Sequence, residues 1–425
     1  MKEVTIYPGS LAGEVLIPPS KSMSHRAIIC AGLSEGVSTI NNAGVSQDIE
    51  ATCEAMKGFG IIVDKEASSL RIKGNAALEL NNSRIDCRES GSTLRFIIPI
   101  AALTGKPVTF CGEGKLIERS LMPYYKIFEK QGIKYETDCG KLPLCINGRL
   151  TSGEFQLEGN ISSQFISGLM FALPLLEGDS QIMITNELES KSYIDLTIKA
   201  LKGFSIYIEN HDYKTFIVKG KQKYRAMNYS VEGDFSQAAF WLAAGALGSE
   251  LVCKGLDMES LQGDKSVLDI IGEMGGRIVV DGDTARSLTA DTKGTVIDAS
   301  QCPDLVPILA VLGALSEGRT EIVNAQRLRL KESDRLRAIS SELGKLGACI
   351  MEKSDGLIIE GRKGLCGGSV DSWNDHRIAM ALAVAATRCE EPVIISNASC
   401  VKKSYPDFWE HYKALGGRIN ERNMG

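Results

Sequence analysis

Six segments of this chain share one design, in which a short polar opening is followed by a dense apolar run. The openings begin at residues 20, 89, 162, 233, 302 and 374, a spacing of roughly 70 residues that exceeds most known repeat periods. Examples of the apolar runs are 94–105, 165–178 and 305–318. A helix that is apolar on every face has to be buried, and the unpaired N–H groups at its start favour anions. The repeat therefore predicts buried helices whose polar starts together bind phosphates or carboxylates.

Length and composition bound the class of protein. A chain of 425 residues is too long for one ordinary core, which favours two domains. Hydrophobic residues make up 44% and charged residues 24%, as in soluble globular proteins. No apolar stretch is long enough to cross a bilayer and no signal region opens the chain, so we expect a cytoplasmic protein without a membrane partner. A formal net charge of −5 argues against broad nucleic-acid binding.

Cysteine and histidine usage gives no indication of a metal. The twelve cysteines contain no Cys-x-x-Cys pair, and several, such as Cys30 and Cys389, lie within apolar runs. That usage is typical of small buried side chains in a reducing compartment. The four histidines are not paired at metal-ligand spacing, so we expect no transition-metal site.

A second kind of helix, amphipathic rather than apolar, alternates with the first. These helices are expected at 47–59, 120–131, 193–202, 264–274, 333–346 and 406–415. Most end at a glycine, which suits a helix C-cap. Short alternating strands then predict hairpins, as at 61–64 with 70–73, 205–209 with 215–219, and 349–352 with 357–360.

Each repeat unit is therefore a strand, a buried helix, a strand, an amphipathic helix and a hairpin. Five units are expected to be continuous, and the sixth is split, because 3–7 at one end and 416–420 at the other would complete it. This predicts an α/β (α+β) fold of two similar three-unit domains with an open cleft between them. Residues 18–229 form the first domain, residues 1–17 with 230–425 form the second, and the chain crosses twice. A solenoid is the alternative, but the complementary ends and very apolar helices favour closed domains.

Basic side chains recur at helix starts, where the positive helix end disfavours them unless an anion is present. They are Lys21 with Arg26, Arg95, Arg119, Arg377, and Lys402 with Lys403. At one start alone, a solvated surface helix is the better interpretation. Five such starts favour anionic ligands, and Arg suits bidentate binding of carboxylate or phosphate. The spacing of a nucleotide P-loop is absent.

Acidic residues lie among these bases. Glu332 and its neighbours in 331–336 form either an ion-paired exposed turn or, because they open a helix, a group able to move a proton. Asp304 is either a helix cap or a catalytic group. Asp48 and Asp234 have the same two interpretations.

Five segments match one known family in order: 18–27 (Pro-Pro-Ser-Lys-Ser-Met-Ser-His-Arg-Ala), 118–123 (Glu-Arg-Ser-Leu-Met-Pro), 162–165 (Ser-Ser-Gln-Phe), 331–336 (Lys-Glu-Ser-Asp-Arg-Leu) and 374–380 (Asn-Asp-His-Arg-Ile-Ala-Met). Over essentially its whole length the chain resembles the 5-enolpyruvylshikimate-3-phosphate synthase family. The resemblance implies the inside-out α/β barrel of the enolpyruvyl transferases, with three β-α-β-α-β-β units in each domain. It also implies transfer of the enolpyruvyl group of phosphoenolpyruvate to the 5-hydroxyl of shikimate 3-phosphate in aromatic amino acid biosynthesis. No metal or organic cofactor is expected, and the protein is expected to be a monomer.

The same resemblance carries site residues onto this chain. Around phosphoenolpyruvate it places Lys21, Gly91, Arg95, Arg119, Gln164, Arg335, Arg377 and Lys403. Around shikimate 3-phosphate it places Ser22, Arg26, Ser162, Ser163, Gln164, Ser190, Tyr193, Asp304 and Lys331, with Tyr193 against the ring. We expect Asp304 to be the base toward the 5-hydroxyl and Glu332 the proton donor and acceptor at the methylene, two roles that are exchangeable. Lys21 then helps to protonate the bridging oxygen of the leaving phosphate.

One segment departs from the family pattern, and two rival functions differ from this family in their expected residues. The family often has Asn-Ala-Gly-Thr-Ala-x-Arg-Pro where this chain has Glu-Ser-Gly-Ser-Thr-Leu-Arg-Phe at 89–96, which leaves glyphosate sensitivity open. The nearest rival is enolpyruvyl transfer to a UDP-amino sugar, but that family has an Asn-rich start and a reactive loop cysteine, whereas Cys111 ends a β-rich run. A non-catalytic anion-binding relative is disfavoured because Lys21, Asp304 and Glu332 are all present.

Overall fold

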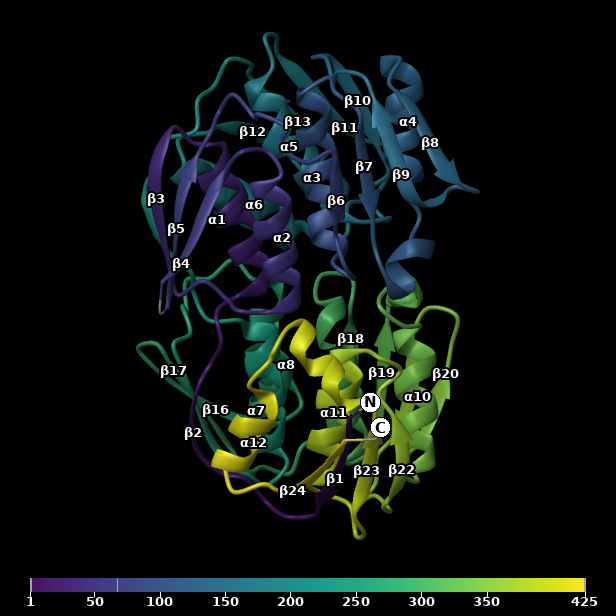
Figure 1. Ribbon diagram of the computed structural model, residues 1–425. Coiled ribbons are helices and arrows are strands. Elements are labelled where there is room, and N and C mark those ends of the chain that lie inside the picture. The colour runs from purple at the N-terminus through teal and green to yellow at the C-terminus, as the bar shows by residue number, and fades with distance from the viewer. Residues whose placement is uncertain (1, 67, 424–425) are drawn as a thin grey trace. The chain divides into compact units, whose positions relative to one another are not determined.

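The computed structural model describes residues 2–66 and 68–423 and separates into two compact units. Residues 19–231 form one, which we call the central unit; residues 2–18 with 232–423 form the other, the terminal unit. Both chain ends lie in the terminal unit (Figure 1). The boundaries expected from the sequence, near residues 17 and 229, lie close to these. None of the helices in the described ranges has the length and hydropathy to span a membrane.

Among the described residues of the central unit, the strands form three four-stranded sheets, in each of which a parallel pair is extended by an antiparallel pair. The first, in spatial order, is β14 (Asn228–Ser230), β3 (Gly36–Asn41), β5 (Ser69–Gly74) and β4 (Ile62–Glu66). The second is β6 (Arg84–Asp86), β7 (Val108–Cys111), β9 (Lys141–Asn147) and β8 (Lys134–Asp138). The third is β10 (Glu154–Leu157), β11 (Ser180–Ile184), β13 (Thr215–Val218) and β12 (Ile208–His211).

The described part of the terminal unit repeats this arrangement three times. The first sheet is β2 (Ala12–Leu16), β15 (Glu250–Lys254), β17 (Thr284–Leu288) and β16 (Arg277–Asp281). The second is β18 (Val296–Asp298), β19 (Arg319–Val323), β21 (Leu357–Glu360) and β20 (Cys349–Glu352). The third is β22 (Gly368–Asp371), β23 (Val393–Ser396), β1 (Lys2–Tyr7) and β24 (Arg418–Asn423).

The split sixth unit is confirmed, but the prediction of five continuous units is wrong for two of them. Antiparallel pairing of β1 with β24, for example Ile6 opposite Ile419, completes the sixth unit from the two ends of the chain. At the two crossings, however, the strands are exchanged: β2 pairs with β15, although α1 follows β2 in sequence, and β14 pairs with β3 instead of joining the unit that follows it. A short strand with few buried positions carries no local signal for its parallel neighbour. Only Val15 is buried in β2.

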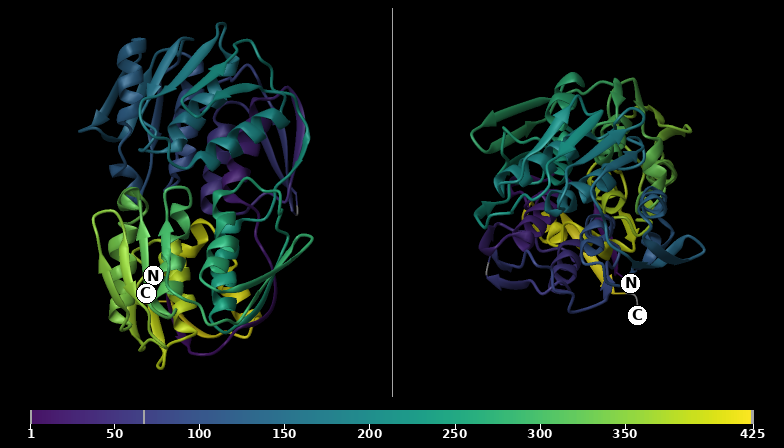
Figure 2. Two further views of the ribbon diagram at one scale, coloured as in Figure 1. Left: turned by 180° about the vertical axis from the view of Figure 1, so that it is seen from behind. Right: turned by 90° about the horizontal axis from the view of Figure 1, so that it is seen from above.

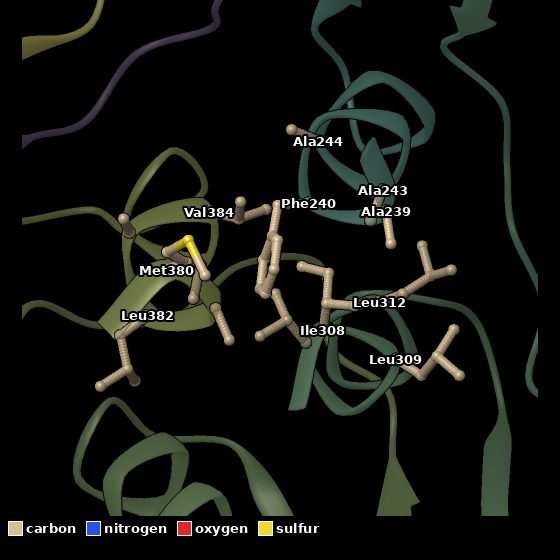
Figure 3. Close-up of a cluster of buried hydrophobic side chains, with 14 of the residues drawn as sticks. Ala239, Phe240, Ala243, Ala244, Ile308, Leu309, Leu312, Met380, Leu382 and Val384 are labelled. Atoms are coloured by element: carbon tan, nitrogen blue, oxygen red, sulfur yellow. The ribbon is translucent and has the colours of Figure 1, made fainter. Parts of the chain in front are cut away.

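Six buried helices confirm the repeat seen in the sequence. In the central unit they are α1 (Lys21–Leu33), α3 (Gly91–Leu103) and α5 (Ser163–Ala172), and in the terminal unit α7 (Phe235–Ala246), α9 (Val306–Ala314) and α11 (His376–Ala386). Within each unit these helices lie inside the sheets in the views of Figures 1 and 2. Phe240 of α7 packs among Ile308 of α9 and Met380 of α11 (Figure 3), and all three side chains are fully buried.

Local side chains explain most of the helix starts. Ser20, Ser90, Ser162, Asp234 and Asp375 each accept a hydrogen bond from a backbone N–H in the first turn of the helix that follows. The helix α9 differs, because the short 3-10 helix η4 (Pro303–Leu305) precedes it. The run at 165–178 is shorter than predicted: α5 ends at Ala172 and passes into η2 (Leu173–Leu175), since Pro174 has no N–H to continue the helix.

The amphipathic helices lie where they were expected, with shifted ends. They are α2 (Gln47–Lys57), α4 (Met122–Gln131), α6 (Lys191–Gly203), α8 (Val267–Glu273), α10 (Arg335–Lys345) and α12 (Phe408–Ala414). Several are preceded by a 3-10 helix: η1 (Gly114–Glu118), η3 (Gly263–Ser266), η5 (Gln326–Leu330) and η6 (Ala398–Lys403). Gly132 ends α4 with φ of 69°, the left-handed conformation that glycine adopts without strain. The predicted hairpin at 349–352 with 357–360 is confirmed as β20 and β21.

Candidate active site

The predicted site residues fall into groups within each unit, and the first group lies at the start of α3. A Cβ added to Gly91 would lie 2.8 Å from Arg119 Nη1 and 3.0 Å from Arg95 Nη1, so two guanidinium groups converge on this glycine. Arg95 Nη1 donates to Gln164 Oε1 at 2.7 Å, and Gln164 Nε2 donates to Ser92 Oγ at 2.8 Å. Two cations at a helix N-terminus are the arrangement that binds a phosphate or carboxylate. The structure thus brings together four of the residues predicted for phosphoenolpyruvate.

The second group of the central unit lies at the start of α1. Lys21 Nζ lies 2.8 Å from Asp48 Oδ2, and both side chains are mostly buried. Arg26 is 2% exposed; its Nη1 donates to Ser22 O at 2.7 Å and its Nη2 to Tyr193 O at 2.9 Å. Burial lowers the pKa of Arg26 to about 10, so the guanidinium stays charged at neutral pH. Lys21, Ser22, Arg26 and Tyr193 therefore belong to one polar cluster.

The serines predicted for shikimate 3-phosphate lie at the starts of α5 and α6. Ser162 caps α5 by accepting from Gln164 N at 3.3 Å, and Ser163 is buried in the same first turn. Ser190 precedes α6 with φ of 54° and is almost fully buried. Thr197 of α6 links these helices to α1, because its hydroxyl accepts from Arg26 Nε and pairs with Ser167 of α5, each at 2.8 Å.

In the terminal unit, three cations surround the carboxylate of Asp304. Arg335 Nη1 donates to Asp304 Oδ1 at 2.7 Å, Arg377 Nη2 to Oδ2 at 3.1 Å, and Lys331 Nζ lies 3.4 Å from Oδ1. Nearby cations favour the ionised form of a carboxylate. Asp304 lies within η4, and no side chain among the described residues caps the start of η4 or of α9, so the capping interpretation of Asp304 is wrong.

Arg335 is the centre of this network. It is 1% exposed, its Nε donates to Asp375 Oδ2 at 2.8 Å, and its Nη2 donates to Glu332 Oε2 at 2.7 Å. Burial alone would lower the pKa of Arg335, but the carboxylates of Asp375, Glu332 and Asp304 together raise it. The guanidinium thus holds both predicted catalytic carboxylates in a fixed geometry. The exposed-turn interpretation of Glu332 does not fit this partly buried pair.

The remaining cations of the terminal unit have defined positions. Burial lowers the pKa of Lys331 to about 8, although the Asp304 carboxylate opposes the shift. Arg377 Nη2 also donates to Ser236 Oγ at 3.1 Å. Lys403, at the end of η6, is largely buried and donates to Asn374 O at 2.7 Å.

Several residues with roles in these clusters were missed or left open. Asp48 pairs with Lys21 while Ser46 caps α2, so the capping interpretation of Asp48 is wrong. Asp234 does cap α7. Asp264 in η3 was missed: burial, and then the charge of Asp304, raise its pKa to about 7. A lone acidic residue at the start of an amphipathic helix gave no signal for this.

Comparisons with known proteins agree along the whole chain. The family model for EPSP synthase (3-phosphoshikimate 1-carboxyvinyltransferase) matches residues 6–412. The 3-phosphoshikimate 1-carboxyvinyltransferase of Clostridium kluyveri is 56% identical over 425 residues, with 100% of both chains covered. The enzyme of the same name from Clostridium perfringens (strain 13 / Type A) is 55% identical over 423 residues, covering 99% of this chain and 100% of that one. The solved EPSP synthase of Acinetobacter baumannii has a TM-score of 0.83 at 24% identity, with 100% of both chains covered, and this likeness confirms the predicted fold class.

Proposed function

The chain belongs to the EPSP synthase (3-phosphoshikimate 1-carboxyvinyltransferase) family, and from that premise we propose which residues perform each step of its reaction. The protein transfers the enolpyruvyl group of phosphoenolpyruvate to the 5-hydroxyl of shikimate 3-phosphate and releases phosphate, in aromatic amino acid biosynthesis. Transfer to a UDP-amino sugar is not favoured, because relatives that match this chain over their full length are named 3-phosphoshikimate 1-carboxyvinyltransferase. The observation that carries the proposal is that the Arg335 guanidinium forms ion pairs with both Asp304 and Glu332.

Asp304 is proposed as the base that accepts the proton of the 5-hydroxyl. Its three cationic neighbours favour the carboxylate, which is the form able to take up a proton. Glu332, once protonated, then delivers its proton to the methylene carbon of phosphoenolpyruvate. The resulting carboxylate later takes a proton back from the methyl group, which regenerates the acid, so that addition is followed by elimination of phosphate. Because one guanidinium holds both carboxylates, the two labels are exchangeable without a change of geometry.

Lys21 is proposed to protonate the bridging oxygen of the departing phosphate. Its ammonium is held by Asp48 Oδ2 at 2.8 Å, which fixes its direction and favours its charged form. A charged ammonium offsets the negative charge that develops on the leaving group.

The anion-binding roles follow from the clusters at the helix starts. For phosphoenolpyruvate we propose Gly91, Arg95, Arg119 and Gln164, together with Lys21, Arg335, Arg377 and Lys403. For shikimate 3-phosphate we propose Ser22, Arg26, Ser162, Ser163, Gln164, Ser190, Tyr193, Asp304 and Lys331. The convergence of Arg95 and Arg119 on Gly91 supports the first set, and the bonds from Arg26 to Ser22 and Tyr193 support the second.

Phosphate release from the purified protein tests the catalytic roles. Asp304→Asn, Glu332→Gln and Lys21→Met are each expected to lower kcat by about 10² or more, the usual range for a lost proton-transfer group. Asp179→Asn and Glu54→Gln remove exposed carboxylates that pair with Lys219 and Lys57, and they serve as matched controls expected to keep full activity. Near-normal release by any one of the three variants would end its assigned role, and a UDP-amino sugar replaces shikimate 3-phosphate as the control acceptor.

A monomeric state, a cytoplasmic location and the lack of a nucleic-acid partner also stay predictions. Sedimentation at micromolar concentration tests the first. Gel-shift with duplex and single-stranded DNA tests the last, with the net charge of −5 arguing against binding.

A further inference from the structure

We propose that His25 is a positioning residue, which holds the start of α3 and its anion site in place through a chain of hydrogen bonds across α1, α2 and α3. The inference rests on the proposed phosphoenolpyruvate site at Gly91. His25 lies one turn after Lys21 on α1 and is fully buried. His25 is not among the residues proposed to touch either substrate.

The chain consists of four buried side chains. His25 Nδ1 lies 2.7 Å from Thr52 Oγ1 on α2, and Thr52 Oγ1 lies 2.7 Å from Thr93 Oγ1 on α3. Thr93 Oγ1 donates to Ser90 Oγ at 2.8 Å. His25, Thr52, Thr93 and Ser90 are each 0% exposed, so water does not compete for these hydrogen bonds.

The direction of the chain assigns the tautomer of His25. Because the Thr93 hydroxyl donates to Ser90, its oxygen accepts from Thr52, and the Thr52 oxygen in turn accepts from His25 Nδ1–H. The other ring nitrogen, Nε2, is buried and has no hydrogen-bond partner among the described residues. A bare lone pair there avoids the larger cost of a buried N–H without an acceptor. Burial, and then the charges of Lys21 and Arg26, lower the pKa of His25, which keeps the ring neutral as this arrangement requires.

The far end of the chain lies at the anion site. Ser90 caps α3 by accepting from Thr93 N at 3.2 Å, and the next residue is Gly91, on which Arg95 and Arg119 converge. Ser90 Oγ therefore accepts hydrogen bonds from both the hydroxyl and the backbone N–H of Thr93, which fixes it at the first turn of α3. Loss of these hydrogen bonds is expected to make the backbone N–H groups at the start of α3, where phosphoenolpyruvate is proposed to bind, more mobile.

The same threonines also touch the segment that orients Lys21. Thr52 Oγ1 and Thr93 Oγ1 lie 3.5 and 3.4 Å from Asp48 O, and the Asp48 carboxylate binds Lys21. One buried network thus joins the starts of α1, α2 and α3. A purely structural role for His25 would require only that it fill space in the core.

Steady-state kinetics on the full chain separate these two roles. Thr52→Val and Thr93→Val keep the shape of the side chain and remove its hydroxyl, and each is expected to raise KM for phosphoenolpyruvate by about tenfold while KM for shikimate 3-phosphate changes much less. His25→Leu is expected to do the same. His25→Asn, whose amide nitrogen takes the place of Nδ1–H, is expected to restore most of the affinity.

The matched control is Thr320→Val, because Thr320 is also fully buried, lies in the terminal unit, and its Oγ1 has no hydrogen-bond partner among the described residues. It is expected to leave both KM values unchanged. The inference is overturned if the folded Thr52 and Thr93 variants keep the parental KM for phosphoenolpyruvate, or if they alter both KM values and kcat together, as general damage to the core would. Arg119→Ala tests the premise that phosphoenolpyruvate binds at Gly91. An unchanged KM for phosphoenolpyruvate in that variant refutes the proposed site. A raised KM in Arg119→Ala, with a parental KM in the threonine variants, refutes only the positioning role. Should His25→Leu fail to fold, the two threonine variants decide the matter alone.

Discussion

Lys331 is a proposed substrate-binding residue whose ionisation couples the site to pH. Its side chain is about a quarter exposed, 26%, and burial lowers its pKa from 10.5 to about 8. At neutral pH the ammonium is charged and suited to a phosphate. As pH rises through 8 the charge is lost, so binding of shikimate 3-phosphate should weaken about 2.5 pH units below the point at which an ordinary lysine loses its charge.

We therefore predict that kcat/KM for shikimate 3-phosphate falls above pH 8, since this ratio reports ionisations of the free enzyme. Lys331→Arg keeps its charge to much higher pH and should shift or abolish this alkaline limb. Lys219→Arg, at an exposed lysine paired with Asp179, is the control and should leave the profile as it is. An alkaline limb that is identical in Lys331→Arg would show that another group controls it.

At the scale of elements, the start of α3 is packed closely against two cationic side chains. A methyl group at Gly91 would lie 2.8 Å from Arg119 Nη1 and 3.0 Å from Arg95 Nη1. These atoms end flexible side chains, so the fold should survive while the guanidinium groups move. Gly91→Ala is predicted to raise KM for phosphoenolpyruvate at least about tenfold, with a melting temperature close to the parent.

A matched control for this substitution is Gly344→Ala in α10, where an added Cβ meets nothing within 4 Å. It is expected to leave KM unchanged and to stabilise the helix slightly, because alanine is the better helix former. A parental KM in Gly91→Ala would mean that Arg95 and Arg119 do not act at this helix start.

Elements were predictable from sequence to the extent that their signals are local. Helix starts are set by caps a few residues away, as Ser90 and Asp375 show, and a run such as 306–314 is apolar enough to be recognised as buried. The pairing of β2 with β15 and of β14 with β3 was not predicted, because the sequence of a short strand does not specify its parallel neighbour. The site itself joins Asp304 to Arg335 and Arg377, which are 31 and 73 positions away. The pattern of basic residues at helix starts does not predict which carboxylate each of them contacts, so these pairs follow only from the family resemblance. Neither the pattern nor the resemblance indicates Asp264.

At the scale of the whole molecule, the order of the strands makes the two units unequal as pieces of chain. Every strand of the central unit comes from one continuous stretch, residues 36–230, and its core side chains lie between Met23 and Val231. The terminal unit needs β1 and β2 from the opposite end of the chain to complete two of its sheets. A piece that begins at residue 232 would leave β24 without its neighbour β1 and would leave β23 and β15 each with one neighbour fewer, exposing unpaired backbone groups.

We therefore predict that residues 19–231 fold alone, with a cooperative thermal transition by circular dichroism, whereas residues 232–425 alone do not. Since Lys2 lies opposite Asn423 in the β1–β24 pair, a short linker from residue 425 to residue 1 should close a hairpin. A chain running from 232 to 425, through the linker and then from 1 to 18, should regain a cooperative transition because both missing strands return to their partners. The absence of a transition in the 19–231 fragment, or its presence in 232–425 without β1 and β2, would show that strand completion does not govern the stability of these units.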